Sequence, residues 1–166
     1  MSPLLRSGLI AAVAALALDQ ASKLWLLNVF ELGRRGAVTV TPFFDLVLAW
    51  NTGISYGWFQ DAGPVGQAVL LAFKVIAIIM LGIWMAKSGT RLAVIGLGLI
   101  IGGAIGNAID RLAYGAVVDF ALFHVQIGGK IYNWYVFNLA DVAIVAGVAS
   151  LLYDSFVTPD AAKRPR

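Results

Sequence analysis

The sequence predicts a mostly α-helical membrane protein with four transmembrane helices and a small β-sheet at the membrane surface. Of its 166 residues, 60% are hydrophobic and 13% are charged, whereas about a quarter of the residues of a soluble domain are charged. Four apolar stretches are each long enough to cross a bilayer. Residues with high strand propensity lie between the first two of them. This length allows one domain, so we expect residues 1–166 to form a single integral membrane unit.

Composition also limits the chemistry. The chain has no Cys, and His124 is its single histidine, so we expect neither thiolate chemistry nor a His-rich metal site. The formal net charge is only +3, and in membrane proteins Lys and Arg collect at the cytoplasmic flanks of helices. We therefore expect no metal, no cofactor and no nucleic-acid partner.

The first apolar stretch covers residues from about 8 to 30. Its Ala-Leu-Ala run at 15–17 is similar to a signal-peptide cleavage site, but the apolar pattern continues past it, which favours a retained helix. Asp19 and Lys23 lie four residues apart, so they share one face of this helix and can neutralise one another. They form either a structural ion pair or part of the machinery that orders an active site.

Two segments outside the spans are expected at the membrane surface, from about 31 to 63 and from about 112 to 133. In the first, residues 38–41 alternate with the strand period and residues 43–50 are also prone to strand formation. In the second, residues 117–120 look like a short strand. We expect a small sheet whose aromatic residues suit the membrane interface.

The remaining spans are predicted from about 65 to 86, 92 to 111 and 134 to 153. The second span carries one charge, Lys74. The third contains glycines at four-residue spacing, which favours close helix packing: Gly98, Gly102 and Gly106.

The distribution of Lys and Arg predicts the orientation in the membrane. One side would hold Arg6, Lys87, Arg91, Lys163, Arg164 and Arg166. The other would hold Arg34, Arg35, Arg111 and Lys130. The bias favours both termini in the cytoplasm, with the surface sheet on the outer side.

Acidic side chains at membrane depth are costly and usually have a paired or functional role. Asp141, counted along a helix from Trp134, is expected roughly 10 Å below the start of the last span. Asp119 lies on a segment outside the same face of the bilayer, so the chain can fold it back toward Asp141. Because two close carboxyl groups cannot both ionise cheaply, such a pair shares one proton near neutral pH and suits peptide hydrolysis.

Polar residues near these acids strengthen the prediction. Asn138 precedes Asp141 by three residues, which would place both on one side of a helix. Asn107 and Arg111 are likewise four residues apart near the end of the third span. Each could position substrate or carboxylate, or could simply make a hydrogen bond between helices or, for Arg111, reach to the interface.

Three other readings remain open. A serine protease could use Ser22 or Ser55 with Lys23 or Lys74, although adjacent residues of a helix do not face each other. A proton-coupled transporter could use a relay of membrane charges, which would be Asp19, Lys23, Lys74 and Asp141. A purely structural subunit would explain the glycines and the ion pair but not two acids aimed at one face.

Five sequence blocks, in order along the chain, resemble those of the lipoprotein signal peptidase (signal peptidase II) family. They are LDQASK (18–23), WNTGISYGWF (50–59), GNAIDR (106–111), VVDF (117–120) and FNLAD (137–141). The resemblance implies an aspartic peptidase of the bacterial inner membrane that cleaves the signal peptide of prolipoproteins before a diacylglyceryl-modified cysteine. It also implies both termini in the cytoplasm, a surface β-cradle near the active site, and inhibition by globomycin.

By the same resemblance, the aspartates of VVDF and FNLAD, here Asp119 and Asp141, are the catalytic pair. The implied substrate-binding or site-orienting residues are Asn51, Asn107, Arg111, Asn138, Asp19 and Lys23. Asp110 also matches, and we interpret it as structural. The expected partners are lipidated prolipoproteins, membrane lipid and globomycin-type inhibitors, bound to a monomer. The chain departs from the family at residues 54–56 (Ile-Ser-Tyr), so the resemblance implies the catalytic pair but not the fine substrate or inhibitor preference.

Overall fold

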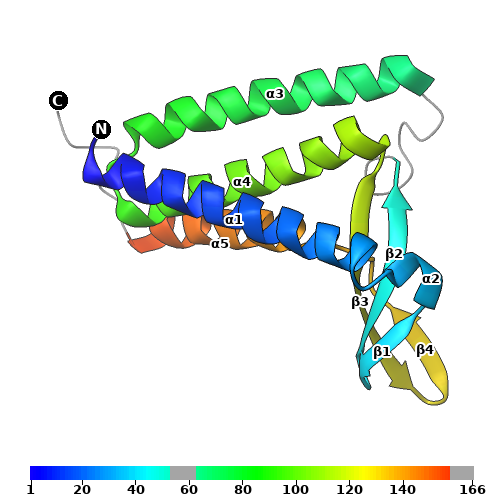
Figure 1. Ribbon diagram of the computed structural model, residues 1–166. Coiled ribbons are helices and arrows are strands. Elements are labelled where there is room, and N and C mark those ends of the chain that lie inside the picture. The colour runs from blue at the N-terminus through cyan, green and yellow to red at the C-terminus, as the bar shows by residue number, and fades with distance from the viewer. Residues whose placement is uncertain (53–62, 158–166) are drawn as a thin grey trace.

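The computed structural model describes residues 1–52 and 63–157, so expectations that rest on residues 54–56 or on the Lys74 side chain fall outside the described part. The helices and strands follow one another along the chain as shown in Figure 1. They are α1 (Pro3–Asn28), α2 (Leu32–Arg35), β1 (Val38–Thr41), β2 (Phe44–Asn51), α3 (Gly63–Lys87), α4 (Arg91–Tyr114), β3 (Val117–Ile127), β4 (Lys130–Asn133) and α5 (Leu139–Val157).

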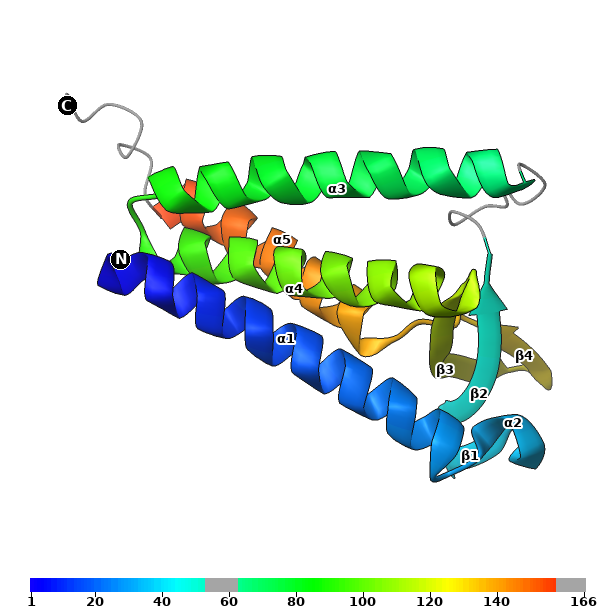
Figure 2. The same ribbon diagram turned by 45° about the horizontal axis from the view of Figure 1, so that its top comes forward.

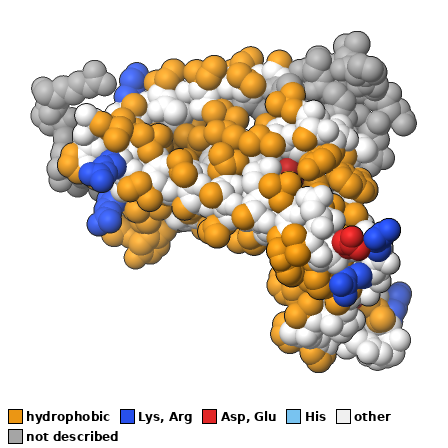
Figure 3. Space-filling model, viewed as in Figure 1, with side chains coloured by type: hydrophobic (Ala, Val, Ile, Leu, Met, Phe, Trp, Pro, Cys, Tyr) orange, Lys and Arg blue, Asp and Glu red, His pale blue; other side chains and the backbone are white. Residues whose placement is uncertain are grey.

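A long helix is present at each of the four predicted spans, so the predicted fold class is confirmed. Among the described residues, α1, α4 and α5 are long and apolar enough to cross a membrane, and Val75–Lys87 of α3 is a shorter apolar helix. Helix α4 is central: 61% of its most apolar stretch is buried, against 22% for α1 and 17% for α5. Hydrophobic side chains are spread over the face of the bundle seen in Figure 3, as expected for a surface that faces lipid.

Local sequence signals explain where these helices begin and end. Ser2 caps α1, its hydroxyl accepting a hydrogen bond from the Leu5 N–H at 3.2 Å. Thr90 caps α4 in the same way, accepting from the Ala93 N–H at 3.1 Å. Gly115 ends α4 with a φ of 72°, a left-handed conformation that glycine adopts without steric cost.

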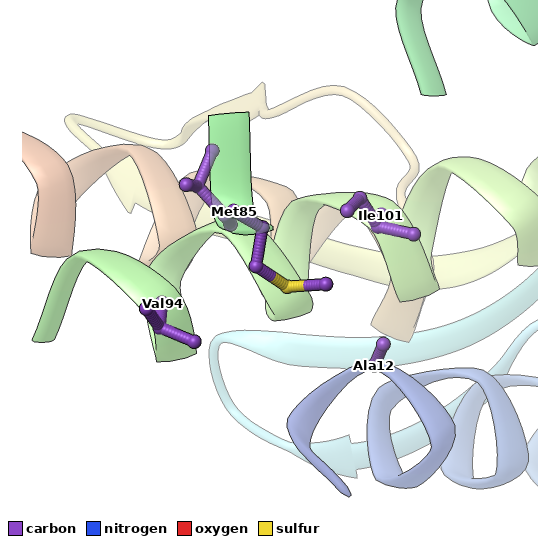
Figure 4. Packing of buried hydrophobic residues seen from close by; sticks show 5 residues of the cluster. Ala12, Met85, Val94 and Ile101 are labelled. Atoms are coloured by element: carbon purple, nitrogen blue, oxygen red, sulfur yellow. The ribbon is translucent and has the colours of Figure 1, made fainter. Parts of the chain in front are cut away.

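Glycines allow α4 to approach its neighbours closely, as predicted from their spacing. A Cβ at Gly98 would overlap the carbonyl oxygen of Gly8, and one at Gly102 would overlap that of Ala12. These glycines therefore bring the backbones of α1 and α4 into contact. Beside them, Ala12, Met85, Val94 and Ile101 pack together with Leu97, and this cluster joins α1, α3 and α4 (Figure 4).

The four strands form one antiparallel sheet in the order β1-β2-β3-β4. Ala49 of β2 lies opposite Asp119 of β3, which fixes the register at the inner end of the sheet. A second buried cluster joins the sheet to the end of α1 and to α2: Leu26, Leu32, Phe120 and Ala121. Figures 1 and 2 show the sheet at one end of the bundle, with the N-terminus and the turn from α3 to α4 at the other.

The last helix begins five residues later than predicted, at Leu139 instead of Trp134. The residues before it continue as an extended chain along β3: Trp134 N–H donates to the Phe123 carbonyl at 2.7 Å, and Phe137 pairs with Ala121. These residues can remain extended because the pairing with β3 provides hydrogen-bond partners for their backbone N–H and C=O groups. Asp141 therefore lies in the first turn of α5, and the expected depth of roughly 10 Å along that helix is wrong.

Candidate active site

Asp119 lies near the start of β3 and is buried, with 3% of its surface exposed. Its Oδ2 accepts a hydrogen bond from Asn51 Nδ2 at 3.2 Å, and its Oδ1 accepts from Asn138 Nδ2 at 2.6 Å. The register explains the first bond, because Asn51 follows Ala49 by two residues and so occupies a diagonal position on the same face of the sheet.

Asp141 and Asn138 form a reciprocal cap at the start of α5. The Asn138 side-chain oxygen accepts from the Asp141 N–H at 3.0 Å, and Asp141 Oδ2 accepts from the Asn138 N–H at 3.2 Å. This arrangement is a capping box. The other carboxylate oxygen, Oδ1, accepts from Asn107 Nδ2 at 3.0 Å. The side chain of Asp141 is thus held in place from α4 and from its own N-cap.

Asn138 connects the two acids. Besides Asp119, its Nδ2 contacts Asn107 Oδ1 at 3.0 Å and the Val118 carbonyl at 3.3 Å. Asn138 is fully buried, and Asn107 nearly so. Because Asn107 in turn donates to Asp141, the two amide side chains hold both carboxyl groups in one network.

Lys23 is buried beneath this network and binds two acids. Its Nζ lies 2.8 Å from Asp19 Oδ2 and 2.7 Å from Asp110 Oδ2. It also donates to Asn107 Oδ1 at 3.2 Å. The predicted pairing of Asp19 with Lys23 is confirmed, but the second partner, Asp110, did not follow from the sequence because it lies on a different helix, far from Lys23 along the chain.

Arg111 and Ser22 lie beside this network and make hydrogen bonds to backbone carbonyls. Arg111 Nη1 donates to the Asn107 carbonyl at 3.3 Å, and its charge interacts with those of Asp119 and Asp141. Ser22 Oγ donates to the Asp19 carbonyl at 2.7 Å, and Lys23 is bound to two carboxylates. A pair made of Ser22 and Lys23 therefore lacks the geometry of a nucleophile and its base.

Asp119 and Asp141 both line a cavity of about 870 Å³. Asn51 and the aromatic segment 134–137 line it on the side of the sheet. A stripe of small and apolar residues from α5 lines the rest: Val142, Ile144, Val145, Ala146 and Ala149. The cavity thus joins two carboxyl groups to an apolar wall, which suits a substrate that carries both a peptide bond and hydrocarbon.

Burial, together with the negative charge of Asp141, raises the pKa of Asp119 from 3.8 to about 6. The hydrogen bonds from Asn51 and Asn138 and the charge of Lys23 act against this rise in pKa. Near neutral pH, Asp119 can therefore hold or release a proton, as an acid–base residue must. Among the described residues, no group of three or more His, Cys, Asp or Glu side chains could hold a metal ion.

Comparisons with known proteins show the family to which this chain belongs. The family model described as signal peptidase (SPase) II matches residues 11–157. A lipoprotein signal peptidase of Nitrobacter hamburgensis is 75% identical over 165 residues, covering 99% of this chain and 100% of the relative. One from Rhodopseudomonas palustris is 72% identical with the same coverage.

Two solved structures, each of a bacterial membrane enzyme, are also similar. The first has a TM-score of 0.74 at 25% identity and covers 96% of this chain and 92% of its own. The second has a TM-score of 0.71 at 26% identity and covers 88% of this chain and 90% of its own. The chain belongs to the signal peptidase II family of membrane peptidases.

Proposed function

We propose that this lipoprotein signal peptidase is an aspartic endopeptidase that cuts diacylglyceryl-modified prolipoproteins just before the lipidated cysteine, with Asp119 and Asp141 as its catalytic pair. The observation that carries the proposal is that the two carboxyl groups open into one cavity, share the Asn107 and Asn138 network, and adjoin an apolar wall. A scissile bond and the hydrocarbon next to it can occupy that space together.

The surroundings of the two acids favour different protonation states. Asp141 lies at the N-terminus of α5 and accepts a backbone N–H, both of which stabilise a negative charge. Asp119, whose pKa is raised to about 6, is the better holder of the shared proton. We therefore assign the ionised role to Asp141 and the protonated role to Asp119 at the start of the reaction.

In the first step, Asp141 takes a proton from water while the water oxygen bonds to the scissile carbonyl carbon. Asp119 donates a hydrogen bond to the carbonyl oxygen and stabilises the negative charge that develops there. The C–N bond then breaks, the carbonyl re-forms, and the departing amine nitrogen receives a proton from the acid pair. The pair finishes with one proton, as it began.

The remaining polar residues hold this pair and the substrate. Asn51 and Asn138 contact Asp119, while Asn107 contacts Asp141. Arg111 offers a positive charge near both acids. Asp19 and Lys23 support the network from α1.

The proposed function includes an orientation in the membrane. The site lies at the end of the bundle that carries the sheet, and the Lys and Arg distribution favours the outer side of the bacterial inner membrane for this end, with both termini in the cytoplasm. The α5 wall would bind the signal helix and acyl chains, each buried CH₂ contributing roughly 0.8 kcal/mol. Globomycin-type inhibitors would occupy the same cavity, and a monomer contains all the residues assigned here.

Replacement of either acid tests the proposal. We expect Asp119→Asn and Asp141→Asn each to lower cleavage of a purified lipidated precursor in detergent by about 10³-fold or more, because neither amide can exchange the required proton. Ser22→Ala is the matched control and should retain activity. Thermal unfolding in the same detergent establishes that each variant is folded. Substantial turnover by either folded Asn variant would refute the catalytic pair.

A further inference from the structure

Two backbone N–H groups next to the proposed catalytic acids donate to buried carboxylates from other helices. Ala140 N–H, which precedes Asp141, donates to Asp19 Oδ1 at 2.9 Å. Val118 N–H, which precedes Asp119, donates to Asp110 Oδ2 at 3.1 Å. Thus α1 fixes the start of α5, and α4 fixes β3, in each case one residue before a catalytic side chain.

The two holding carboxylates are themselves tied together. Lys23 Nζ binds both, and Gln20 Nε2 donates to Asp110 Oδ1 at 2.9 Å and to Asp19 Oδ2 at 3.2 Å. Gln20 also donates to the Gly106 carbonyl at 3.2 Å. Gly106 leaves space for this arrangement, because a Cβ there would overlap the carboxylate of Asp19.

We infer that Gln20 and Asp110 are positioning residues that, with Asp19 and Lys23, set the separation of the two catalytic carboxyl groups. We call these four residues the clamp. Asp110 holds the backbone at Asp119, Asp19 holds the backbone at Asp141, and Gln20 and Lys23 join the two holders. The inference rests on the proposed function and assigns Asp110, interpreted from sequence as structural, a role in the geometry of the reaction.

The clamp would do more than stabilise the fold, because it would set the distance between the carboxyl groups of Asp119 and Asp141. Asp119 is influenced by Asp141 from α5, by Lys23 from α1 and by Arg111 from α4. If a loosened clamp lets Asp141 move away, its charge raises the pKa of Asp119 less, so that pKa falls. A residue that merely packs the helices would lower stability without this change in the pH dependence.

Gln20→Leu is the principal test, because leucine is similar in size but lacks the amide. We expect kcat on a lipidated precursor to fall roughly 10- to 100-fold, since small misplacements of reacting groups have effects of this size. KM should change less than about twofold, because Gln20 does not line the substrate cavity. The alkaline limb of kcat/KM should move to lower pH. Gln20→Asn, which keeps the amide but is one methylene shorter, should show a smaller change of the same kind.

Ser22→Ala is the matched control, since Ser22 is half-buried on the same helix and bonds only the Asp19 carbonyl among the interactions described. A wild-type kcat and pH profile in folded Gln20→Leu would overturn the clamp. So would a loss of activity with an unmoved pH profile, and if Gln20→Leu does not fold, the same criteria apply to Gln20→Asn. Asp119→Asn in the same assay separates the two proposals: its activity would refute the catalytic pair, whereas its inactivity beside a normal Gln20→Leu would refute the clamp alone.

Discussion

At the scale of single residues, the folded protein changes the protonation of Asp119. Asp119 is buried beside Asp141, and its pKa is raised to about 6 from an ordinary value of 3.8. Such a carboxyl group takes up a proton more readily in the folded chain than in the unfolded one. Its contribution to stability is therefore fully present below pH 3.8 and is lost as the pH rises through about 6.

Asp119→Asn should therefore change stability in a pH-dependent way. The substituted amide cannot ionise, so we expect the stability of the variant relative to wild type to increase from about pH 4 to about pH 8, with most of the change between about 4 and 6. Unfolding midpoints in detergent at a series of pH values measure this. Ser150→Ala, which removes a hydroxyl donating to the Ala146 carbonyl, should differ from wild type by the same amount at every pH. A pH-independent gap for Asp119→Asn would contradict the raised pKa.

Contacts between residues that are near in the chain could be predicted from the sequence. The ion pair of Asp19 with Lys23 follows from helix spacing. The contact of Lys23 with Asp110 does not, because it depends on how α1 packs against α4. The capping role of Asn138 could have been found, since Asn-x-x-Asp before an apolar run is a variant of a helix-start signal.

At the scale of elements, α4 organises the bundle. It packs against α1 through Gly98 and Gly102, and a Cβ at Gly103 would overlap the Ala140 carbonyl of α5. Its existence and length were predictable from its apolar run. The start of α5 was not, because residues 134–137 are as apolar as a helix and only their pairing with β3 distinguishes them.

Gly102→Ala should loosen the contact between α1 and α4. The new methyl group would meet the Ala12 carbonyl, so we expect a loss of about 1 to 3 kcal/mol, as is usual for an overpacked interior. Gly82→Ala in α3 is the control, because nothing lies within 4 Å of a Cβ at that position. Thermal unfolding in detergent should show a lower midpoint for Gly102→Ala and little change for Gly82→Ala. Equal unfolding midpoints for the two variants would contradict the close contact of α1 and α4 at Gly102.

For the whole molecule, the important feature is the separation of its two ends. The sheet lies at one end of the bundle, and the turn from α3 to α4 lies at the other (Figure 2). The cavity is lined by residues of the sheet and by α5 as far as Ala149. Lys and Arg distribution predicts that the second end faces the cytoplasm. The long apolar helices were predictable from sequence because hydropathy indicates them directly, whereas the order of strands in the sheet requires the three-dimensional register.

The absence of cysteine makes this orientation measurable. We expect Lys130→Cys, at the exposed turn between β3 and β4, to react with a membrane-impermeant maleimide in intact spheroplasts. Gly89→Cys, in the exposed turn between α3 and α4, should react only after permeabilisation. The unsubstituted chain should not be labelled in either case. Labelling of Gly89→Cys in intact spheroplasts would reverse the proposed topology.

The proposed catalytic centre combines residues that are synthesised far apart in time. Asp19 emerges from the ribosome early, and the Ala140 N–H from which it accepts a hydrogen bond emerges 121 residues later. A nascent chain with α1 to α4 in the bilayer therefore already carries Asp19 and Asp110 but lacks Asp141. With the proposed pair, proteolytic competence would arise only when the final helix is inserted, and translation that stops early would leave an inert fragment in the membrane.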